Sequence, residues 1–138
     1  MNNPPSKEEL ITSVIEFIEN DIIDELVGQK RFHAHVAKNS LQIILRQLKL
    51  EEKNNRFEKN RLKEILKIDK DLNELNKILC QKIDTEEINI NDNDLIDHLF
   101  KTTMEKLSID QPNYSAYLDE KANYCLLYTS PSPRDPWT

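Results

Sequence analysis

The stretch from Arg31 to Leu50, RFHAHVAKNSLQIILRQLKL, decides how the rest of this chain is interpreted. At about 100° per residue, its apolar side chains form two groups on a helix instead of a single stripe. The groups are Phe32, Val36, Ile43 and Leu50, and Ala37, Leu41, Ile44 and Leu48. A helix that is apolar over most of its circumference is normally buried between neighbours. We therefore predict a central buried helix at about residues 29–50.

A polar line of three residues, His33, Ser40 and Gln47, runs between the two apolar groups. Polar side chains within a buried surface need hydrogen-bond partners or water. The line therefore predicts either a structural network that bridges helices or a small polar pocket.

The composition indicates a soluble helical protein of 138 residues, with 38% apolar residues, 32% charged residues and a single glycine. The formal net charge is -6, and no Lys/Arg block interrupts the acidic balance. This argues against a nucleic-acid surface and against an anionic membrane. No apolar run reaches the roughly 20 residues that span a bilayer, and the first residues lack the pattern of a signal peptide. We expect a cytoplasmic location.

Four further amphipathic segments are predicted at residues 10–18, 56–68, 72–83 and 95–107. Ser6 and Glu9 form a capping box before the first, and a bend is expected near Asn20. Asp69 is predicted to cap the fourth helix and Asp92 or Asn93 the fifth, and residues 51–55 are predicted to connect the central helix to the third. The expected fold class is all-α: a compact bundle of about five helices in a single domain over residues 6–118, after a disordered lead over residues 1–5.

The last part of the chain differs in composition from the rest, and residues 119–138 are predicted to be a disordered tail. The string CLLYTSPSPRD, from Cys125 to Asp135, resembles the codon-by-codon translation of a transposase-based sequencing adapter. We therefore interpret residues 125–138 as an artefact that takes no part in the predicted fold. Cys125 is accordingly not paired with Cys80.

Metal and nucleotide sites are not predicted. His33 and His35 are two residues apart and point to different sides of a helix, so they cannot chelate one ion. The run Asn91–Asp94 resembles the start of a calcium loop but lacks the glycine and the closing glutamate that such a loop needs. No Gly-rich phosphate loop is present. We expect no metal and no cofactor.

The fifth predicted helix carries a line of His98, Thr102 and Lys106 along the border of its apolar face. Asp94 lies one turn before His98 and could orient it as a general base. No Ser or Cys nucleophile is placed to use that base, so an interaction face is the preferred interpretation. No catalytic residue is assigned, and the question of enzymatic activity stays open, with a non-enzyme favoured.

The residues FHAHVAKNSLQII from Phe32, LNKILCQKI from Leu75 and HLFKTTMEKLSIDQPNY from His98 resemble a family of small bacterial proteins classified as a domain of unknown function. The resemblance covers roughly residues 5–117. The chain departs from that family's pattern at Asp24, His35 and Gln47, where proline, arginine and glutamate are frequent. Genes of the family commonly stand beside aminoglycoside-phosphotransferase-like kinases and acyl-CoA dehydrogenases.

The resemblance implies an accessory or protein-interaction subunit for such a kinase, or for the dehydrogenase, in acyl-CoA catabolism. The expected interaction face comprises Asn39, His98, Thr102, Lys106, Asp110 and Tyr114. The alternative is a small-molecule or acyl-group binding protein, with His33, Ser40 and Gln47 lining a pocket. Neither nucleic acid nor membrane is an expected partner, and a homo-oligomer is left open.

Overall fold

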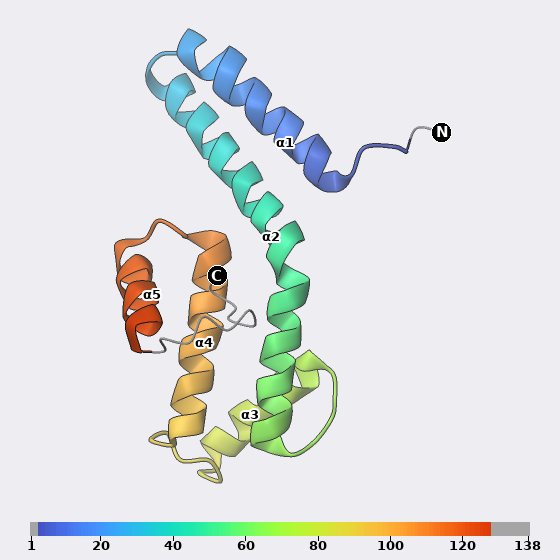
Figure 1. The fold of residues 1–138 in the computed structure, drawn as a ribbon, viewed down its shortest axis with the longest axis vertical. Coiled ribbons are helices and arrows are strands. Elements are labelled where there is room, and N and C mark those ends of the chain that lie inside the picture. The colour runs from blue at the N-terminus through green and yellow to red at the C-terminus, as the bar shows by residue number, and fades with distance from the viewer. Residues whose placement is uncertain (1–2, 128–138) are drawn as a thin grey trace. The chain divides into compact units, whose positions relative to one another are not determined.

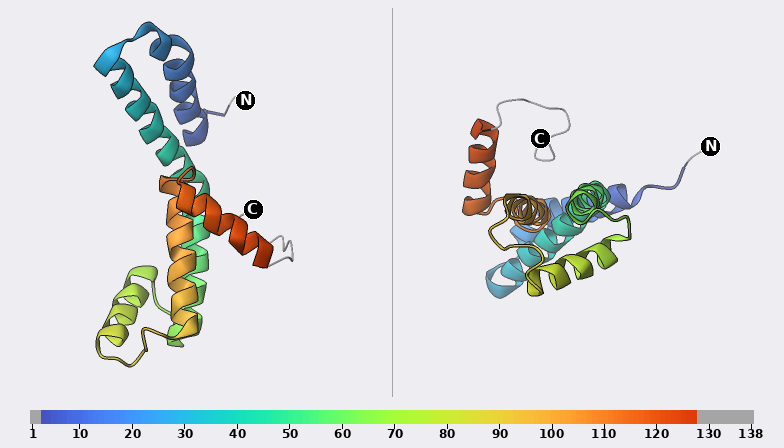
Figure 2. Two further views of the ribbon diagram at one scale, coloured as in Figure 1. Left: turned by 90° about the vertical axis from the view of Figure 1, so that its left-hand side faces the viewer. Right: turned by 90° about the horizontal axis from the view of Figure 1, so that it is seen from below.

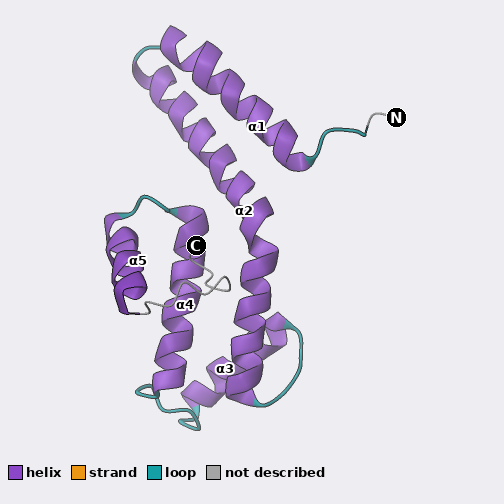
Figure 3. Cartoon of the chain, viewed as in Figure 1, coloured by secondary structure: helices purple, strands orange, loops and turns teal. Residues whose placement is uncertain are grey.

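The computed structural model describes residues 3–127, and within them the chain forms five α-helices and no strand (Figures 1 and 3). The predicted all-α class is therefore confirmed. The chain divides into two units, residues 1–51 and 52–138, and each is described by itself. The single domain expected over residues 6–118 thus includes parts of both units.

Helix α1, Lys7–Phe17, opens the first unit. The Ser6 side chain accepts a hydrogen bond from the Glu9 amide at 3.1 Å, as the capping box predicts. A π-helical turn, η1 (Ile18–Ile22), and a 3-10 turn, η2 (Ile23–Glu25), follow α1. This irregular segment falls where a bend near Asn20 was expected. The connection ends at Gly28, whose φ of 62° favours glycine.

Helix α2 runs without a break from Gly28 to Leu66, through both units. The connection expected at residues 51–55 is therefore wrong. Those residues, EEKNN, are polar, but they contain neither glycine nor proline, and Glu and Lys are good helix formers. Their polarity reflects a solvated segment of helix and not a loop. The helix ends at Leu66, and the next residue, Lys67, adopts a left-handed φ of 60°.

Residues 29–50 are less buried than their apolar pattern predicts. None of them is fully buried, and Phe32 keeps 64% of its surface exposed. Within the first unit, α1 lies antiparallel beside this part of α2 and covers one side of it (Figures 1 and 2). The predicted central buried helix is thus corrected to one member of a two-helix hairpin. A single neighbouring helix cannot cover an apolar surface that extends around most of the circumference.

The second unit holds the main core, to which α2, α3 (Leu72–Asp84) and α4 (Asn93–Asp110) contribute. Its buried members are Leu62, Leu66, Leu75, Leu79 and Leu95. Two of them, Leu62 and Leu75, have no exposed surface. Burying each of these leucines contributes about 1.5–3 kcal/mol of transfer free energy.

Side-chain caps fix the starts of α3 and α4. Asp71 accepts from the Glu74 amide at 2.8 Å, so Asp71 and not Asp69 caps α3. Asp69 instead lies 3.5 Å from the Lys63 ammonium group. Asp92 accepts from the amides of Asp94 and Leu95, so of the two predicted caps Asp92 and not Asn93 is used. The calcium-like run at residues 91–94 therefore supplies an ordinary N-cap.

Helix α5, Ser115–Leu127, packs on α4 through a second apolar cluster in which Tyr117 and Met104 are buried. Phe100 and Leu107 flank this contact. Helix α5 includes residues 119–127 of the segment that composition indicated as a disordered tail. Of the adapter-like string, residues 128–135 lie outside the described residues.

Candidate functional site

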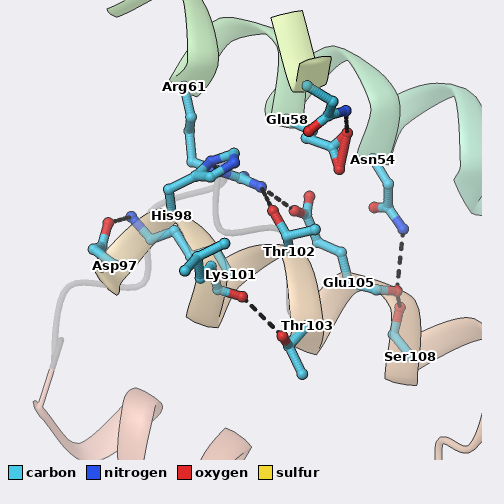
Figure 4. A network of polar contacts seen from close by, with 12 residues as sticks. Asn54, Glu58, Arg61, Asp97, His98, Lys101, Thr102, Thr103, Glu105 and Ser108 are labelled. Carbon is cyan, nitrogen blue, oxygen red and sulfur yellow. Dashed lines mark hydrogen bonds and ion pairs between the residues drawn. The ribbon is translucent and has the colours of Figure 1, made fainter. Parts of the chain in front are cut away.

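A polar network joins α2 to α4 in the second unit (Figure 4). Arg61 is its centre. The Arg61 Nε donates to Nδ1 of His98 at 3.1 Å, and Nη2 donates to Oγ1 of Thr102 at 3.0 Å. The same Nη2 group also forms an ion pair with Oε1 of Glu105. One guanidinium group thus connects three side chains of the facing helix.

Helical spacing explains why these residues meet. His98, Thr102 and Glu105 occupy positions i, i+4 and i+7 of α4, so they project from one face. Arg61 lies one turn from both Phe57 and Ile65, within the apolar face of α2. The views in Figures 1 and 2 both show α4 running alongside this part of α2. The polar network is therefore built into the helix–helix contact and flanked by the leucine core.

His98 is almost fully buried, with 2% of its surface exposed. Burial, and to a smaller extent the Arg61 charge, lower the pKa of His98 to about 4, and Asp97 partly offsets both effects. The imidazole is therefore neutral at pH 7. Because Nδ1 accepts from Arg61, the ring proton resides on Nε2.

Glu105 is the most deeply buried acidic group of the network. Burial raises the pKa of Glu105, whereas the hydrogen bond and the charge of Arg61 lower it. Its second carboxylate oxygen, Oε2, is buried and has no hydrogen-bond partner among the described residues. The Glu105 carbonyl accepts from Asn54 Nδ2 at 3.4 Å and from Ser108 Oγ at 2.6 Å. The backbone and the side chain of Glu105 therefore both bond α4 to α2, through Asn54 and Arg61.

A small cleft of about 210 Å³ lies beside the network. Its lining residues are Arg61, Glu64, Ile65, Lys67, Asp94, Asp97 and His98. The charges in it are mixed, and Asp97 is also paired with Lys101 at 2.9 Å. Among the described residues no group of three or more His, Cys, Asp or Glu is placed to hold a metal ion. The free Cys80 lies exposed on α3.

The predicted pocket residues His33, Ser40 and Gln47 are exposed on α2 in the first unit. The Ser40 hydroxyl donates to the Val36 carbonyl of its own helix at 2.9 Å. The His33 line was expected between two buried apolar groups, but His33 is exposed and His35 is the more covered of the two histidines. The buried side of this helix was misassigned, because the side that faces α1 carries several polar residues with long side chains.

The predicted interaction face is divided by the structure. Lys106, Asp110 and Tyr114 are exposed in the second unit, whereas His98 and Thr102 point into the network. Asn39 is exposed in the first unit. Asp94, expected to orient His98, lines the cleft beside it.

Sequence reasoning missed Arg61, Glu105 and Asn54. A signal for Arg61 was present, because a charged residue in the middle of an apolar helical face requires a buried partner. The partner could not be named from the pattern, since Glu105 lies 44 residues further along the chain.

No helix in the described part of the chain is long and apolar enough to cross a membrane. Comparison with curated proteins and with solved structures gave no match. A family model described as a domain of unknown function, DUF6285, matches residues 24–114, which is more than half of the chain. The match confirms the resemblance to a family without an assigned function, and the chain belongs to the DUF6285 family.

Proposed function

We propose that this protein is an accessory interaction subunit that docks on a phosphotransferase-like kinase of acyl-CoA catabolism. The supporting observation is an exposed stripe along α4, formed by Ile96, Leu99, Thr103, Lys106 and Asp110. We call this set the α4 stripe. Two large apolar side chains, Ile96 at 50% and Leu99 at 47% exposure, lie in it beside charged residues. Exposed apolar side chains beside polar and charged ones are common in protein-binding surfaces.

The position of the stripe follows from what the rest of α4 already contacts. One face of α4 holds the network with Arg61, and a second face packs on α5 through Met104 and Phe100. The α4 stripe is the remaining face. Tyr114, at the turn before α5, is also half exposed, and the aromatic ring and hydroxyl of tyrosine suit an interface.

The polar network supports a binding role over a catalytic one. Arg61 already binds three side chains of α4, and its bond to Thr102 engages that hydroxyl. His98 is neutral and held by its Nδ1 atom. These bonds hold the two helices together and position the stripe that α4 presents.

Biolayer interferometry at micromolar concentrations tests whether the purified protein binds the kinase whose gene stands beside its own. Leu99→Ser is expected to weaken binding at least about tenfold, because one of the two apolar anchors of the α4 stripe is lost. Ile90→Ser is the matched control, since Ile90 is also an exposed apolar residue of the second unit. Absence of binding by the parent protein, or equal effects of both variants, would contradict the proposal. Binding to the acyl-CoA dehydrogenase instead would reassign the partner.

A second candidate function is small-molecule binding, favoured by the cleft beside His98 and not by the exposed line of His33. The cleft is smaller than the roughly 300–1,000 Å³ of sites for drug-sized ligands, so it suits a small polar group. Thermal-shift titration with acyl-CoA and with short carboxylic acids tests this function. Lys67→Ala should abolish any stabilisation that arises from the cleft, whereas Lys77→Ala, on the exposed face of α3, should retain it.

A further inference from the structure

We propose that the cleft beside His98 binds a small zwitterion, namely a free amino acid with a short side chain. The proposal rests on the second candidate function, because it names the class of ligand for the same cleft. It does not depend on the kinase partner, which is proposed to bind the α4 stripe.

The buried imidazole of His98 supplies a hydrogen-bond donor without a partner. Its Nδ1 atom accepts from Arg61, so the ring proton lies on Nε2, and Nε2 has no partner among the described residues. Within the same part of the chain, Oε2 of Glu105 is the one fully enclosed side-chain atom that lacks a partner, so Nε2 is in contact with open space. Because the His98 ring lines the cleft and keeps 2% of its surface exposed, that space is the cleft. A ligand oxygen there would complete the hydrogen bonding of this buried side chain.

Two cationic side chains line the same cleft as His98. Arg61 uses Nε and Nη2 for its bonds to α4, whereas its Nη1 group makes no hydrogen bond to the described residues. The ammonium group of Lys67 forms no ion pair within the described part of the chain. A planar guanidinium, an ammonium group and an imidazole N–H are the donors that bind carboxylates most strongly. This part of the cleft is therefore suited to a carboxylate group.

The cleft also contains carboxylates that lack a countercharge. Asp97 is paired with Lys101 at 2.9 Å. Glu64 and Asp94 line the cleft as well, and neither forms an ion pair among the residues that the structure describes. A carboxylate only accepts hydrogen bonds, and an ammonium group only donates them. This part of the cleft is therefore suited to an ammonium group.

The two sets of charges favour a zwitterion over an ion of one sign. A simple anion would bond to His98 and Lys67, but it would also be repelled by the unpaired carboxylates. A simple amine would be accepted by Glu64 and Asp94, but it would be repelled by Lys67 and would leave the His98 donor unused. A molecule that carries both an ammonium and a carboxylate group satisfies both sets.

The volume of the cleft limits the size of the ligand. The cleft measures about 210 Å³. At roughly 30 Å³ for each water molecule, this is the space of about seven waters. Amino acids with short side chains, such as glycine, alanine and serine, have a similar number of non-hydrogen atoms. Larger amino acids would extend beyond the cleft.

Titrations of the full chain, followed by heteronuclear NMR, test the proposal with three matched probes. These are L-alanine, propionate, which lacks the amino group, and ethylamine, which lacks the carboxylate. We expect L-alanine to bind with a Kd of about 1 mM or lower, and at least about tenfold more tightly than either of the other probes. The imidazole Nε2 signal of His98 should shift as L-alanine binds, whereas the signals of His33 and His35 in the first unit should not.

The outcomes separate this proposal from the candidate function on which it rests. If propionate bound as tightly as L-alanine and shifted the His98 signal, the cleft would remain a small-molecule site, but the zwitterion would be overturned. If none of the probes and no acyl-CoA shifted the His98 signal, both the zwitterion and the small-molecule function of the cleft would be overturned.

Two exposed side chains of the cleft can be changed without removing a bond of the polar network. Asp94→Asn should reduce the preference for L-alanine over propionate several-fold, because the ammonium group loses an acceptor. Lys67→Met should weaken L-alanine and propionate alike by about tenfold, without weakening ethylamine. Asp119→Asn and Lys77→Met are the matched controls, because both residues are exposed and lie outside the cleft, and they should leave all three affinities within about twofold. Equal effects of the cleft variants and the controls would overturn the proposal.

Discussion

Arg61 of α2 and Glu105 of α4 form an ion pair that is largely removed from water, with side-chain exposures of 16% and 5%. Oε1 of Glu105 accepts from Arg61, whereas Oε2 has no partner among the described residues. Burying two charges carries a desolvation cost that their attraction only partly offsets. The pair therefore determines how α2 and α4 meet more than it adds to the net stability of the fold.

Loss of Arg61 should be strongly destabilising. Arg61→Met leaves Glu105 buried without a countercharge and removes the donor to His98 and Thr102. We expect the free energy of unfolding to fall by about 3–5 kcal/mol. Urea unfolding followed by circular dichroism measures it. Arg56→Met is the control, because Arg56 is exposed on the same helix and its loss should cost less than about 0.5 kcal/mol. Similar losses in the free energy of unfolding for both variants would show that Arg61 has no special role.

Neutralising Glu105 should be much milder than removing Arg61. Glu105→Gln keeps an acceptor for Arg61 and removes a buried charge with an unpartnered oxygen. Burial raises the pKa of Glu105, so the folded protein holds this proton to higher pH than the unfolded chain does. The stability that this group contributes is complete below its unfolded pKa and is lost as pH rises through the folded value.

Glu105→Gln should therefore match or exceed the parent stability at pH 7, and its advantage should disappear in acid. Urea unfolding at several pH values gives this comparison. Glu64→Gln, an exposed residue of the same helix as Arg61, is a suitable control. A loss at pH 7 as large as that of Arg61→Met would show that the Glu105 charge itself is required.

His98 should make the protein less stable in acid. Its pKa is lowered from 6.5 to about 4 in the folded state, so the unfolded chain takes up the proton first. The contribution of His98 is complete above pH 6.5 and is lost as pH falls to about 4, by up to about 3 kcal/mol. His98→Asn keeps an acceptor near Arg61 but does not titrate, so its stability should fall less over this range. If the free energy of unfolding changed with pH in parallel for the parent and the variant, the lowered pKa of His98 would be contradicted.

Local signals predicted the helix starts at Ser6 and Asp92, because each cap bonds to an amide within three residues. The same local reasoning failed at residues 51–55, where polarity was interpreted as a loop although the helix continues. The start of α3 was assigned to Asp69, and the ion pair of Asp69 with Lys63 depends on how the chain turns after α2. The spacing of apolar residues along a helix does not predict contacts of this kind.

Only part of the candidate site could be predicted from the sequence. His98 and Thr102 could be identified, because two polar residues one turn apart at the border of an apolar face require partners. Glu105 was missed in favour of Lys106, since a shift of one residue moves a side chain by about 100° around the helix. The apolar circumference of residues 29–50 predicted a buried helix, and the described neighbours cover one side of it.

Glu86 offers a stabilising substitution. It follows the end of α3 with a left-handed φ of 63°, its amide bonds to the Ile83 carbonyl at 3.2 Å, and its side chain is exposed. A residue with a Cβ atom is strained there, whereas glycine is not. Glu86→Gly should raise the free energy of unfolding by up to about 1 kcal/mol, measured by urea unfolding. Glu87→Gly is the matched control. Glu87 lacks the positive φ, so glycine there increases the freedom of the unfolded chain, and it also removes an exposed ion pair with Lys82 at 3.9 Å; both effects should lower stability. A loss of stability in both variants would show that the turn after α3 does not require the left-handed conformation.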